Sequence, residues 1–354
     1  MKLRLFGLLG SMKKLILARL LSVFVSALCV ASCITSCLVS CTNKSSEPTV
    51  WIYTSLYKDT VAEIQPQLEK EFPGVKFSFY QAGSEDVAAK VQAEDMAGKI
   101  QADVLVFSDR FWFENMATQG KLLNYKPANS DKVDTVFKNA DGAFTTVSFP
   151  IMVLAYNSDV VAEKDAPKSF KELTQAKWKG KVSTGSPLAS GTAFTTVAFL
   201  SKSYGWDFFK DLRKNDLIAE GGNSGVVRRL QSKERPVGIV LLENILRLST
   251  TDPRVKHTLP EDGAIIQSNV LGIVKKDGDQ AVAKKVADWF FAQKGQEAMA
   301  KSFMYPSVPG GPTPVGAPEF STVMKKAPIW SKEFVRDTMQ TREKIKDEFS
   351  KIIF

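Results

Sequence analysis

The sequence predicts an α/β protein of two lobes, each a mainly parallel sheet flanked by helices, joined by two extended hinge segments. Short apolar runs that suit buried strands alternate with stretches whose apolar residues recur every three or four positions, as in amphipathic helices. This alternation restarts midway along the chain. The 354 residues also exceed what one hydrophobic core usually holds. A doubled α/β unit explains both observations.

The first unit shows the order strand, helix, strand, helix, strand, which is typical of a parallel sheet covered by helices. Its expected elements are a strand at 50–53, a helix ended by Pro73-Gly74, a strand at 75–80, a helix with Ser84 as N-cap, and a buried strand at 103–107. Trp51 lies inside the first strand, so we expect it in the core.

The second unit is bounded by two extended segments, at 144–158 and 264–274. Between them we expect a strand at 182–184, helices at 191–204, 206–217 and 225–232, and a second buried strand at 237–242. From Ala281 the chain is mostly helical, and it ends in an amphipathic helix. The predicted first lobe is therefore 49–150 plus 266–354, and the second is 151–265.

The N-terminal segment carries all four cysteines, at positions 29, 33, 37 and 41. Lys13 and Lys14 precede a mostly apolar stretch and then small residues, the pattern of an export signal. Arg19 interrupts the apolar run, which is shorter than the roughly 20 residues of a membrane-spanning helix. A cysteine at the cut site resembles the bacterial lipoprotein box, in which the thiol receives a lipid.

We predict a signal peptide at 1–40, lipidation of Cys41 and a polar tether at 41–48, because Leu38 stands three residues before Cys41. Cys33 and Cys37 remain alternatives, as does translation from Met12 instead of Met1. Cleavage before Cys41 leaves 42 basic and 38 acidic residues, a net charge of +4 instead of +9. That balance is ordinary, so nucleic acid is not an expected partner.

Several short stretches resemble, in order and spacing, the solute-binding proteins of bacterial ABC importers. They are residues 50–55, 101–104, 179–182, 190–193 and 293–297. The similar group is named for ferric-iron binding and also holds thiamine, phosphonate and sugar-phosphate binders. The resemblance implies a type II periplasmic-binding-protein fold and delivery of a solute to a permease in the inner membrane. It also implies a monomer that is lipid-anchored, faces the periplasm or the outside, and needs no cofactor.

The candidate ligand site follows from the strand ends, because ligands of open α/β sheets bind outside the carboxyl ends of the strands. Four loops there carry small hydroxyls or bare amides at helix starts, which suits an oxyanion. Their candidate residues are Ser55, Tyr57, Ser108, Ser190, Gly191, Thr192, Asn223 and Ser224. Each hydroxyl has a simpler alternative role, as an N-cap for its own helix alone.

Glu243 follows the strand at 237–242 and joins this candidate set as a carboxylate acceptor for a hydroxyl or an amine. The alternative is a solvated acid at a helix start. The favoured ligand is a small phosphorylated, phosphonate-bearing or carboxylate-bearing solute. Ferric iron is the alternative, although the chain has no adjacent tyrosine pair, and only Asp109, Glu243 and Tyr57 offer anionic oxygens nearby.

The composition also speaks against an enzyme. His257 is the single histidine, and no cysteine follows Cys41, so the Ser-His and Cys-His nucleophile arrangements are missing. No spacing of acidic residues indicates a paired-carboxylate hydrolase. A purely structural lipoprotein would not need two lobes with polar loops at the strand ends. We therefore expect a binding protein without catalytic residues.

Overall fold

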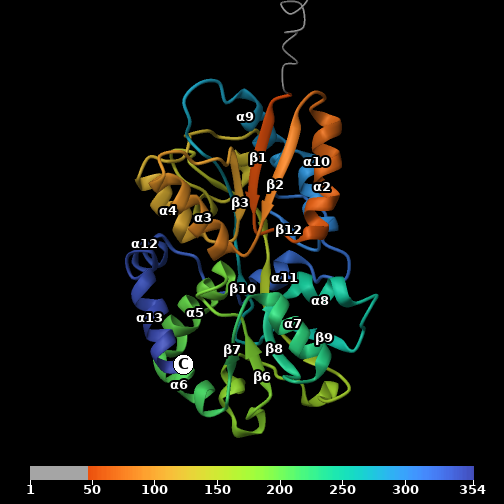
Figure 1. The fold of residues 1–354 in the computed structure, drawn as a ribbon. Helices are drawn as coiled ribbons and strands as arrows, with labels where there is room; N and C mark the ends of the chain where they lie inside the picture. The colour runs from red at the N-terminus through yellow and green to blue at the C-terminus, as the bar shows by residue number, and fades with distance from the viewer. Residues whose placement is uncertain (1–46) are drawn as a thin grey trace, which may run out of the picture. The chain divides into compact units, whose positions relative to one another are not determined.

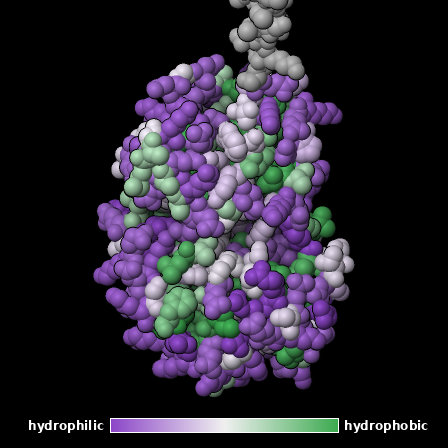
Figure 2. Space-filling model, viewed as in Figure 1, coloured by the Kyte–Doolittle hydropathy of each residue, from purple (hydrophilic) through white to green (hydrophobic). Residues whose placement is uncertain are grey.

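A computed structural model describes residues 47–354, and its strands form two mixed sheets of six strands each (Figure 1). The predicted signal peptide and Cys41 lie outside the described residues. Among residues 47–354, no helix is both long and apolar enough to cross a membrane. The face shown in Figure 2 is mainly hydrophilic, with hydrophobic groups scattered over it.

The first sheet, with its helices, forms the first lobe. Its strands, in the order β12-β4-β11-β3-β1-β2, are β1 (Thr49–Thr54), β2 (Lys76–Gln81), β3 (Val104–Phe107), β4 (Thr145–Phe149), β11 (Asn269–Ile273) and β12 (Tyr305–Pro306). Its helices are α2 (Lys58–Glu71), α3 (Ser84–Met96), α4 (Arg110–Thr118), α9 (Ala281–Phe291) and α10 (Gln293–Lys301). The apolar side chains of β1 and β3 lie against these helices and form the core of the lobe.

The second sheet forms the second lobe. Its strands are β5 (Ile151–Asn157), β6 (Val182–Thr184), β7 (Ile218–Ala219), β8 (Val237–Leu241), β9 (Val255–Thr258) and β10 (Ile265–Ile266). Their order is β10-β5-β8-β6-β7, and β9 also pairs with β5. The helices are α5 (Gly191–Tyr204), α6 (Trp206–Lys214), α7 (Asn223–Ser232) and α8 (Leu242–Leu248). This lobe confirms the predicted restart of the α/β pattern.

Both sheets are mixed, so the prediction of mainly parallel sheets is wrong in that detail. In the first sheet β1 pairs in parallel with β2 and β3, whereas β11 runs antiparallel to β3 and β4. In the second sheet β6 is parallel to β7 and β8, whereas β5 is antiparallel to β8. Strands β5 and β11, which run against β8 and β3, are the first strands that the chain forms after each crossing between the lobes.

Two extended connections pass from one sheet to the other. One runs from β4 through Pro150 into β5, and the second runs from β10 through Gln267 and Ser268 into β11. The backbone N–H of Gln267 donates to the carbonyl of Pro150 at 2.8 Å, so the two connections lie side by side where they cross. Their positions agree with the extended segments that the sequence predicts.

The C-terminal segment differs from the expected assignment to the first lobe. It contains α11 (Phe320–Met324), α12 (Lys332–Gln340) and α13 (Arg342–Ile353). Helix α12 contacts α4 of the first lobe, but α13 packs on α5 and α6 of the second, as Figure 1 shows. The ring of Phe349 meets that of Phe209 at 5.3 Å between centroids. The chain therefore returns to the second lobe at its end.

Three local expectations are also corrected. Trp51 is 39% exposed and is therefore not part of the core. Tyr53 lies on the same face of β1 and is buried, so the helices that cover this face reach Tyr53 but not Trp51. Gly83 is the N-cap of α3, and Ser84 is its first helical residue. Helix α6 ends at Lys214 instead of 217, and α7 begins at Asn223, two residues before the predicted start.

Candidate functional site

A cavity of about 150 Å³ lies between the two lobes, at the ends of their strands. Eight of the nine predicted ligand residues line it, and they come from both lobes: Ser55, Tyr57, Ser108, Ser190, Thr192, Asn223, Ser224 and Glu243. Gly191 does not line it. Loops that lie far apart in the sequence thus meet at the ends of the strands, where the sequence predicted the ligand site.

Five helices of the two lobes begin at this cavity: α2, α3, α5, α7 and α8. The residues before α2, α3 and α7 are Tyr57, Gly83 and Gly222, and none of their side chains caps its helix. In α5, the Ser190 hydroxyl accepts from the backbone N–H of Ala193 at 3.4 Å. The first turn of a helix has unsatisfied N–H groups and a partial positive charge. No lysine or arginine among residues 47–354 lines the cavity, so the positive groups on its wall are these helix ends.

On the second lobe, the polar side chains form a short connected network. The hydroxyls of Ser190 and Thr192 are 3.0 Å apart, and the amide of Asn223 donates to the Thr192 hydroxyl at 3.0 Å. The amide oxygen of Asn223 has no hydrogen-bond partner among the described residues. This network fixes the orientation of the Thr192 hydroxyl at the start of α5.

On the first lobe, Ser108 is held by two partners. Its backbone N–H donates to the Ser55 hydroxyl at 3.2 Å, and its own hydroxyl donates to the side chain of Asn269. The Asn269 amide in turn donates to Ser148 at 3.0 Å. Strand β11, which comes from the second connection between the lobes, therefore positions the loop after β3.

Glu243 lies in the first turn of α8 and is only 2% exposed. Burial raises its pKa to about 8, although the nearby Arg247 guanidinium and the backbone N–H of Ile151 oppose this shift. One carboxyl oxygen has no hydrogen-bond partner among the described residues. The raised pKa favours the neutral acid, which donates a hydrogen bond, over the carboxylate acceptor that the sequence suggested.

Tyr57 stands beside Glu243 as the other ionisable group on the cavity wall. Burial and the neighbouring Glu243 raise its pKa, so its phenol stays protonated. The guanidinium of Arg247 lies 5.1 Å from the centre of its ring and pairs with Asp59 at 3.0 Å. Asp59 belongs to α2 and Arg247 to α8, so this ion pair joins the two lobes at the edge of the cavity.

Gly191 has a different position from the one predicted. A Cβ built on it would lie 1.8 Å from the backbone oxygen of Ser108, in the opposite lobe. The first residue of α5 is thus a point where the two lobes touch, and only a residue without a Cβ fits there.

Asp109 and His257 lie away from the cavity wall. The Asp109 carboxylate accepts from the backbone N–H of Trp112 at 3.0 Å, which caps α4, and from Arg342 of α13 at 2.5 Å. His257 sits on β9 opposite Ala155, and burial lowers its pKa. Within residues 47–354, no cluster of three or more His, Cys, Asp or Glu side chains is arranged to hold a metal ion.

Sequence reasoning missed several residues of the cavity wall, among them Gln81, Gly83, Ser84, Asn269 and Met304. Gln81 is the last residue of β2. The expectation that ligands bind beyond the carboxyl ends of strands, applied to this second strand, would have identified Gln81 and the start of α3. Asn269 and Met304 had no comparable signal, because they reach the cavity through the return of the chain to the first sheet.

The family model of the bacterial extracellular solute-binding proteins matches residues 99–329 of the chain. An uncharacterised protein of Haemophilus influenzae is 27% identical over 237 residues, which span 63% of this chain and 67% of that protein. A probable ABC transporter periplasmic-binding protein of Sinorhizobium fredii is 27% identical over 195 residues, or 52% of this chain and 54% of that one.

Solved structures share the fold. The periplasmic binding protein AfuA of Actinobacillus pleuropneumoniae, with fructose-6-phosphate bound, superposes with a TM-score of 0.76 at 23% identity, over 87% of this chain and 99% of that one. Iron-bound HitA of Pseudomonas aeruginosa gives 0.74 at 18% identity, over 85% and 99%. At these identities the superpositions show a common two-lobed architecture, and the ligand has to be argued from this chain's own cavity.

Proposed function

The chain belongs to the bacterial extracellular solute-binding proteins, and on that premise we propose that it captures a small anionic solute between its lobes for an ABC permease. The observation that carries the choice of an anion is the cavity itself. The N-termini of α2, α3, α5 and α7 and several hydroxyls surround it, and among residues 47–354 no basic side chain on its wall competes with them for an anion. Backbone amides at helix starts are suited to phosphate, phosphonate and carboxylate oxygens.

The two acidic groups of the wall fit the same proposal. Glu243 and Tyr57 keep their protons at neutral pH, so each offers an O–H donor to an anion instead of a competing negative charge. The volume of about 150 Å³ suits a compact anionic group with few further atoms. The relative named as an ABC periplasmic-binding protein and the fold neighbour that holds a sugar phosphate support this class of ligand.

Ferric iron is less well supported, although one fold neighbour is iron-bound. A hard cation needs several anionic oxygen ligands. The cavity wall supplies a neutral acid and a protonated phenol, and Asp109 is engaged with α4 and Arg342. The donors here favour an anion over a trivalent cation.

The family is extracellular, so the protein is exported. We propose in addition that a lipid on Cys41 anchors it to the cell membrane, facing the periplasm or the outside, that it acts as a monomer, and that it catalyses no reaction. Capture would proceed by closure of the lobes through bending at the crossing connections near Pro150 and Gln267.

The experiment is calorimetry of the purified protein with inorganic phosphate, 2-aminoethylphosphonate, fructose-6-phosphate and ferric citrate. We expect at least one phosphorus-containing anion to bind, and ferric citrate to leave the protein colourless. A saturating ligand at 100 times its dissociation constant should add about 2.7 kcal/mol of stability. A coloured complex with stoichiometric iron, and no binding of the anions, would overturn the proposal.

Substitutions at Thr192 then test the site. Thr192→Ala removes one hydroxyl and should weaken binding about ten- to hundredfold, because a hydrogen bond to a charged group contributes about 1.5–3 kcal/mol. Thr192→Asp places a carboxylate at the start of α5 and should abolish binding. Thr322→Asp adds the same charge at an exposed position of α11 and should leave affinity unchanged. Unaltered affinity in folded Thr192→Asp would move the site elsewhere.

A further inference from the structure

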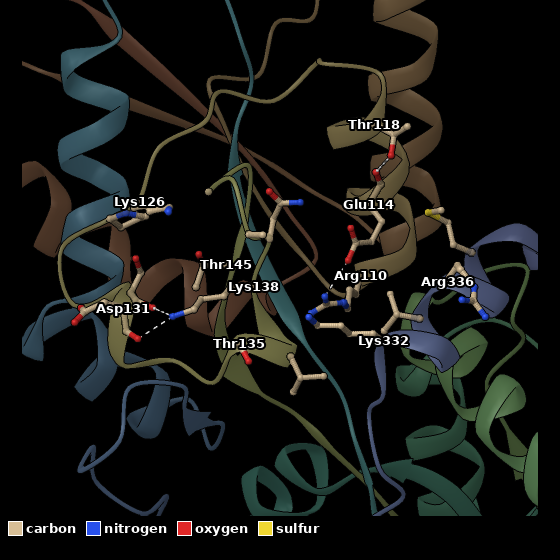
Figure 3. A pocket seen from close by; sticks show the side chains of 18 of the residues that line it. Arg110, Glu114, Thr118, Lys126, Asp131, Thr135, Lys138, Thr145, Lys332 and Arg336 are labelled. Atoms are coloured by element: carbon tan, nitrogen blue, oxygen red, sulfur yellow. Dashed lines mark hydrogen bonds and ion pairs between the residues drawn. The ribbon is translucent and has the colours of Figure 1, made fainter.

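A second and larger pocket, of about 870 Å³, lies in the first lobe. Its walls come from α4, from the segment between Lys126 and Thr145, and from α12, as Figure 3 shows. It shares no lining residue with the cavity between the lobes. None of the predicted ligand residues lines it. Its volume falls in the range of about 300–1,000 Å³ that is usual for small-molecule sites.

The pocket carries an excess of positive charge. Five basic side chains line it against two acidic ones, and the acidic pair is Glu114 and Asp131. The basic set is Arg110, Lys126, Lys138, Lys332 and Arg336. Lys138 donates to the backbone oxygens of Ser130 and Asp131, so part of its charge is already directed at the protein. In Figure 3 Arg110 and Lys332 lie on the same side of the pocket.

Arg110 is the feature that points to a ligand. It is only 5% exposed, yet just one nitrogen, Nη2, has a hydrogen-bond partner, the Glu114 carboxylate at 2.9 Å. Nε and Nη1 have none among the described residues. A buried donor without an acceptor is costly. The face of Phe144, 5.4 Å from the guanidinium carbon, is a partial substitute at best.

Apolar side chains complete the walls. Val136 and Pro127 come from the 126–145 segment, and Val335 and Met339 come from α12. The pocket therefore combines the Arg110 guanidinium on one wall with apolar side chains on the other walls. An anionic group attached to an apolar body matches both features.

We propose that this pocket is a second binding site, for a small organic anion whose carboxylate or phosphate pairs with Arg110 and whose apolar part lies against Val136, Val335 and Met339. Nε and Nη1 are buried in the structure, so pairing with a ligand requires the guanidinium to turn toward the pocket. The proposal does not depend on what binds between the lobes. The competing explanation is that Arg110 only packs α4 against Phe144 and forms an ion pair with Glu114 within that helix.

The test uses calorimetry of the purified protein with octanoate and octyl phosphate as probes and octanamide as the uncharged control. We expect saturable binding of at least one anion and none of octanamide. Arg110→Gln should weaken that binding about ten- to hundredfold, as expected for hydrogen bonds to a charged group. Lys332→Gln, at an exposed position of α12, should weaken it about two- to fivefold, since its contribution is that of an exposed charge.

Two control variants separate the possible results. Lys99→Gln removes one positive charge from an exposed position after α3 and should leave binding unchanged. Thr192→Asp, which disrupts the cavity between the lobes, should also leave octanoate binding unchanged. Should Arg110→Gln fail to fold, Lys332→Glu tests whether the positive charge of the pocket holds the anion. It should weaken binding more than Lys332→Gln, because it adds a negative charge to the pocket wall. No saturable binding of either anion, equal binding of octanamide, or unaltered affinity in both pocket variants would overturn the proposal.

Discussion

At the scale of single residues, Glu243 shows how burial decides the chemistry of an acid. It sits at the start of α8 on the wall of a cavity that otherwise presents donors. A charged carboxylate there would repel an anion. Because burial raises its pKa to about 8, the acid keeps its proton at neutral pH and adds another donor. An anionic solute should therefore bind more weakly as the pH rises through that value.

The same shift predicts a pH dependence of stability. The unfolded chain releases the Glu243 proton near pH 4.5 and the folded protein near pH 8, so the folded state holds one more proton between these values. Stability should therefore fall as pH rises through this window, by up to about 1.4 kcal/mol per pH unit from this group. Urea titrations of Glu243→Gln should show a correspondingly flatter profile, with the variant relatively more stable at the alkaline end.

Glu261 supplies the matched control, because it is exposed and Glu261→Gln makes the same change from carboxyl to amide outside the core. Its profile should follow that of the unsubstituted protein. Parallel profiles for Glu243→Gln and the unsubstituted protein across the whole window would show that Glu243 ionises normally in the folded state.

At the scale of elements, the start of α5 serves two purposes. Ser190 and Thr192 face the cavity, while Gly191 between them touches the backbone of Ser108 in the other lobe. Alternate residues of one helical turn thus contact the ligand space and the opposite lobe. The lobes can therefore come this close together only because residue 191 is a glycine.

Gly191→Ala should prevent full closure, because the new Cβ would lie 1.8 Å from the Ser108 oxygen. We expect affinity for the solute found by the calorimetric screen to fall at least about tenfold, with an intact fold. Small-angle scattering at saturating ligand should give a larger radius of gyration than for the unsubstituted protein. Gly222→Ala also adds a methyl group at the cavity wall, but its Cβ would meet no atom closer than 4.0 Å, so it is the comparison for the radius of gyration. Equal radii and affinities for Gly191→Ala and the unsubstituted protein would exclude this role.

Helix α13 links the lobes by charge. It packs on α5 and α6, and its Arg342 pairs with Asp109 at 2.5 Å and Glu85 at 2.7 Å, both in the first lobe. Lys346 also reaches Glu85, at 2.8 Å. Burial raises the pKa of Glu85, although the attraction of Arg342 opposes the shift. The Asp109 side chain is 1% exposed, so its partner compensates a charge that water does not reach.

Arg342→Ala should therefore destabilise the protein by about 3 kcal/mol, because it leaves a buried carboxylate without its cation. Thermal or urea unfolding measures this loss, and scattering without ligand should show a larger radius. Lys210→Ala removes an exposed partner of Asp207 on α6 and should leave stability almost unchanged, because a solvent-exposed pair contributes little. Equal losses for the two variants would show that the Arg342 pairs have no special weight.

At the scale of the whole molecule, the parts agree with a protein that closes around a solute outside the cytoplasm. The two sheets are joined by neighbouring connections at Pro150 and Gln267, and the cavity takes its walls from both lobes. Bending at the connections would open the cavity, while Arg247 and Arg342 would hold it closed through their ion pairs with the first lobe.

Membrane attachment is predicted to depend on Cys41. In cells expressing Cys41→Ser, we expect the protein to move from the membrane fraction to the soluble exported fraction, because the proposed lipid would have no thiol to attach to. Fractionation followed by immunoblotting measures this. Cys33→Ser and Cys37→Ser are the matched controls and should stay in the membrane fraction. Retention of Cys41→Ser, with release of one of the others, would place the lipid upstream.

The sequence by itself determined most of the local structure and brought most of the candidate ligand residues to one cavity. Periodicity located strands such as β1 and β3 and set both ends of α5, because the local spacing of apolar residues reflects which side is buried. The strand-end rule selected eight residues that meet at one cavity, because parallel strands bring their carboxyl ends to the same edge.

Only the tertiary structure decided what depends on partners distant in the chain. The ionisation of Glu243 depends on the burial that both lobes create, and the role of Asp109 depends on Arg342, which lies 233 residues later. The contact of Gly191 with Ser108, the return of α13 to the second lobe and the exposure of Trp51 have the same origin. The local spacing of apolar residues indicates which side of a helix or strand is buried. Which residues pack against that side is decided by contacts between segments far apart in the sequence.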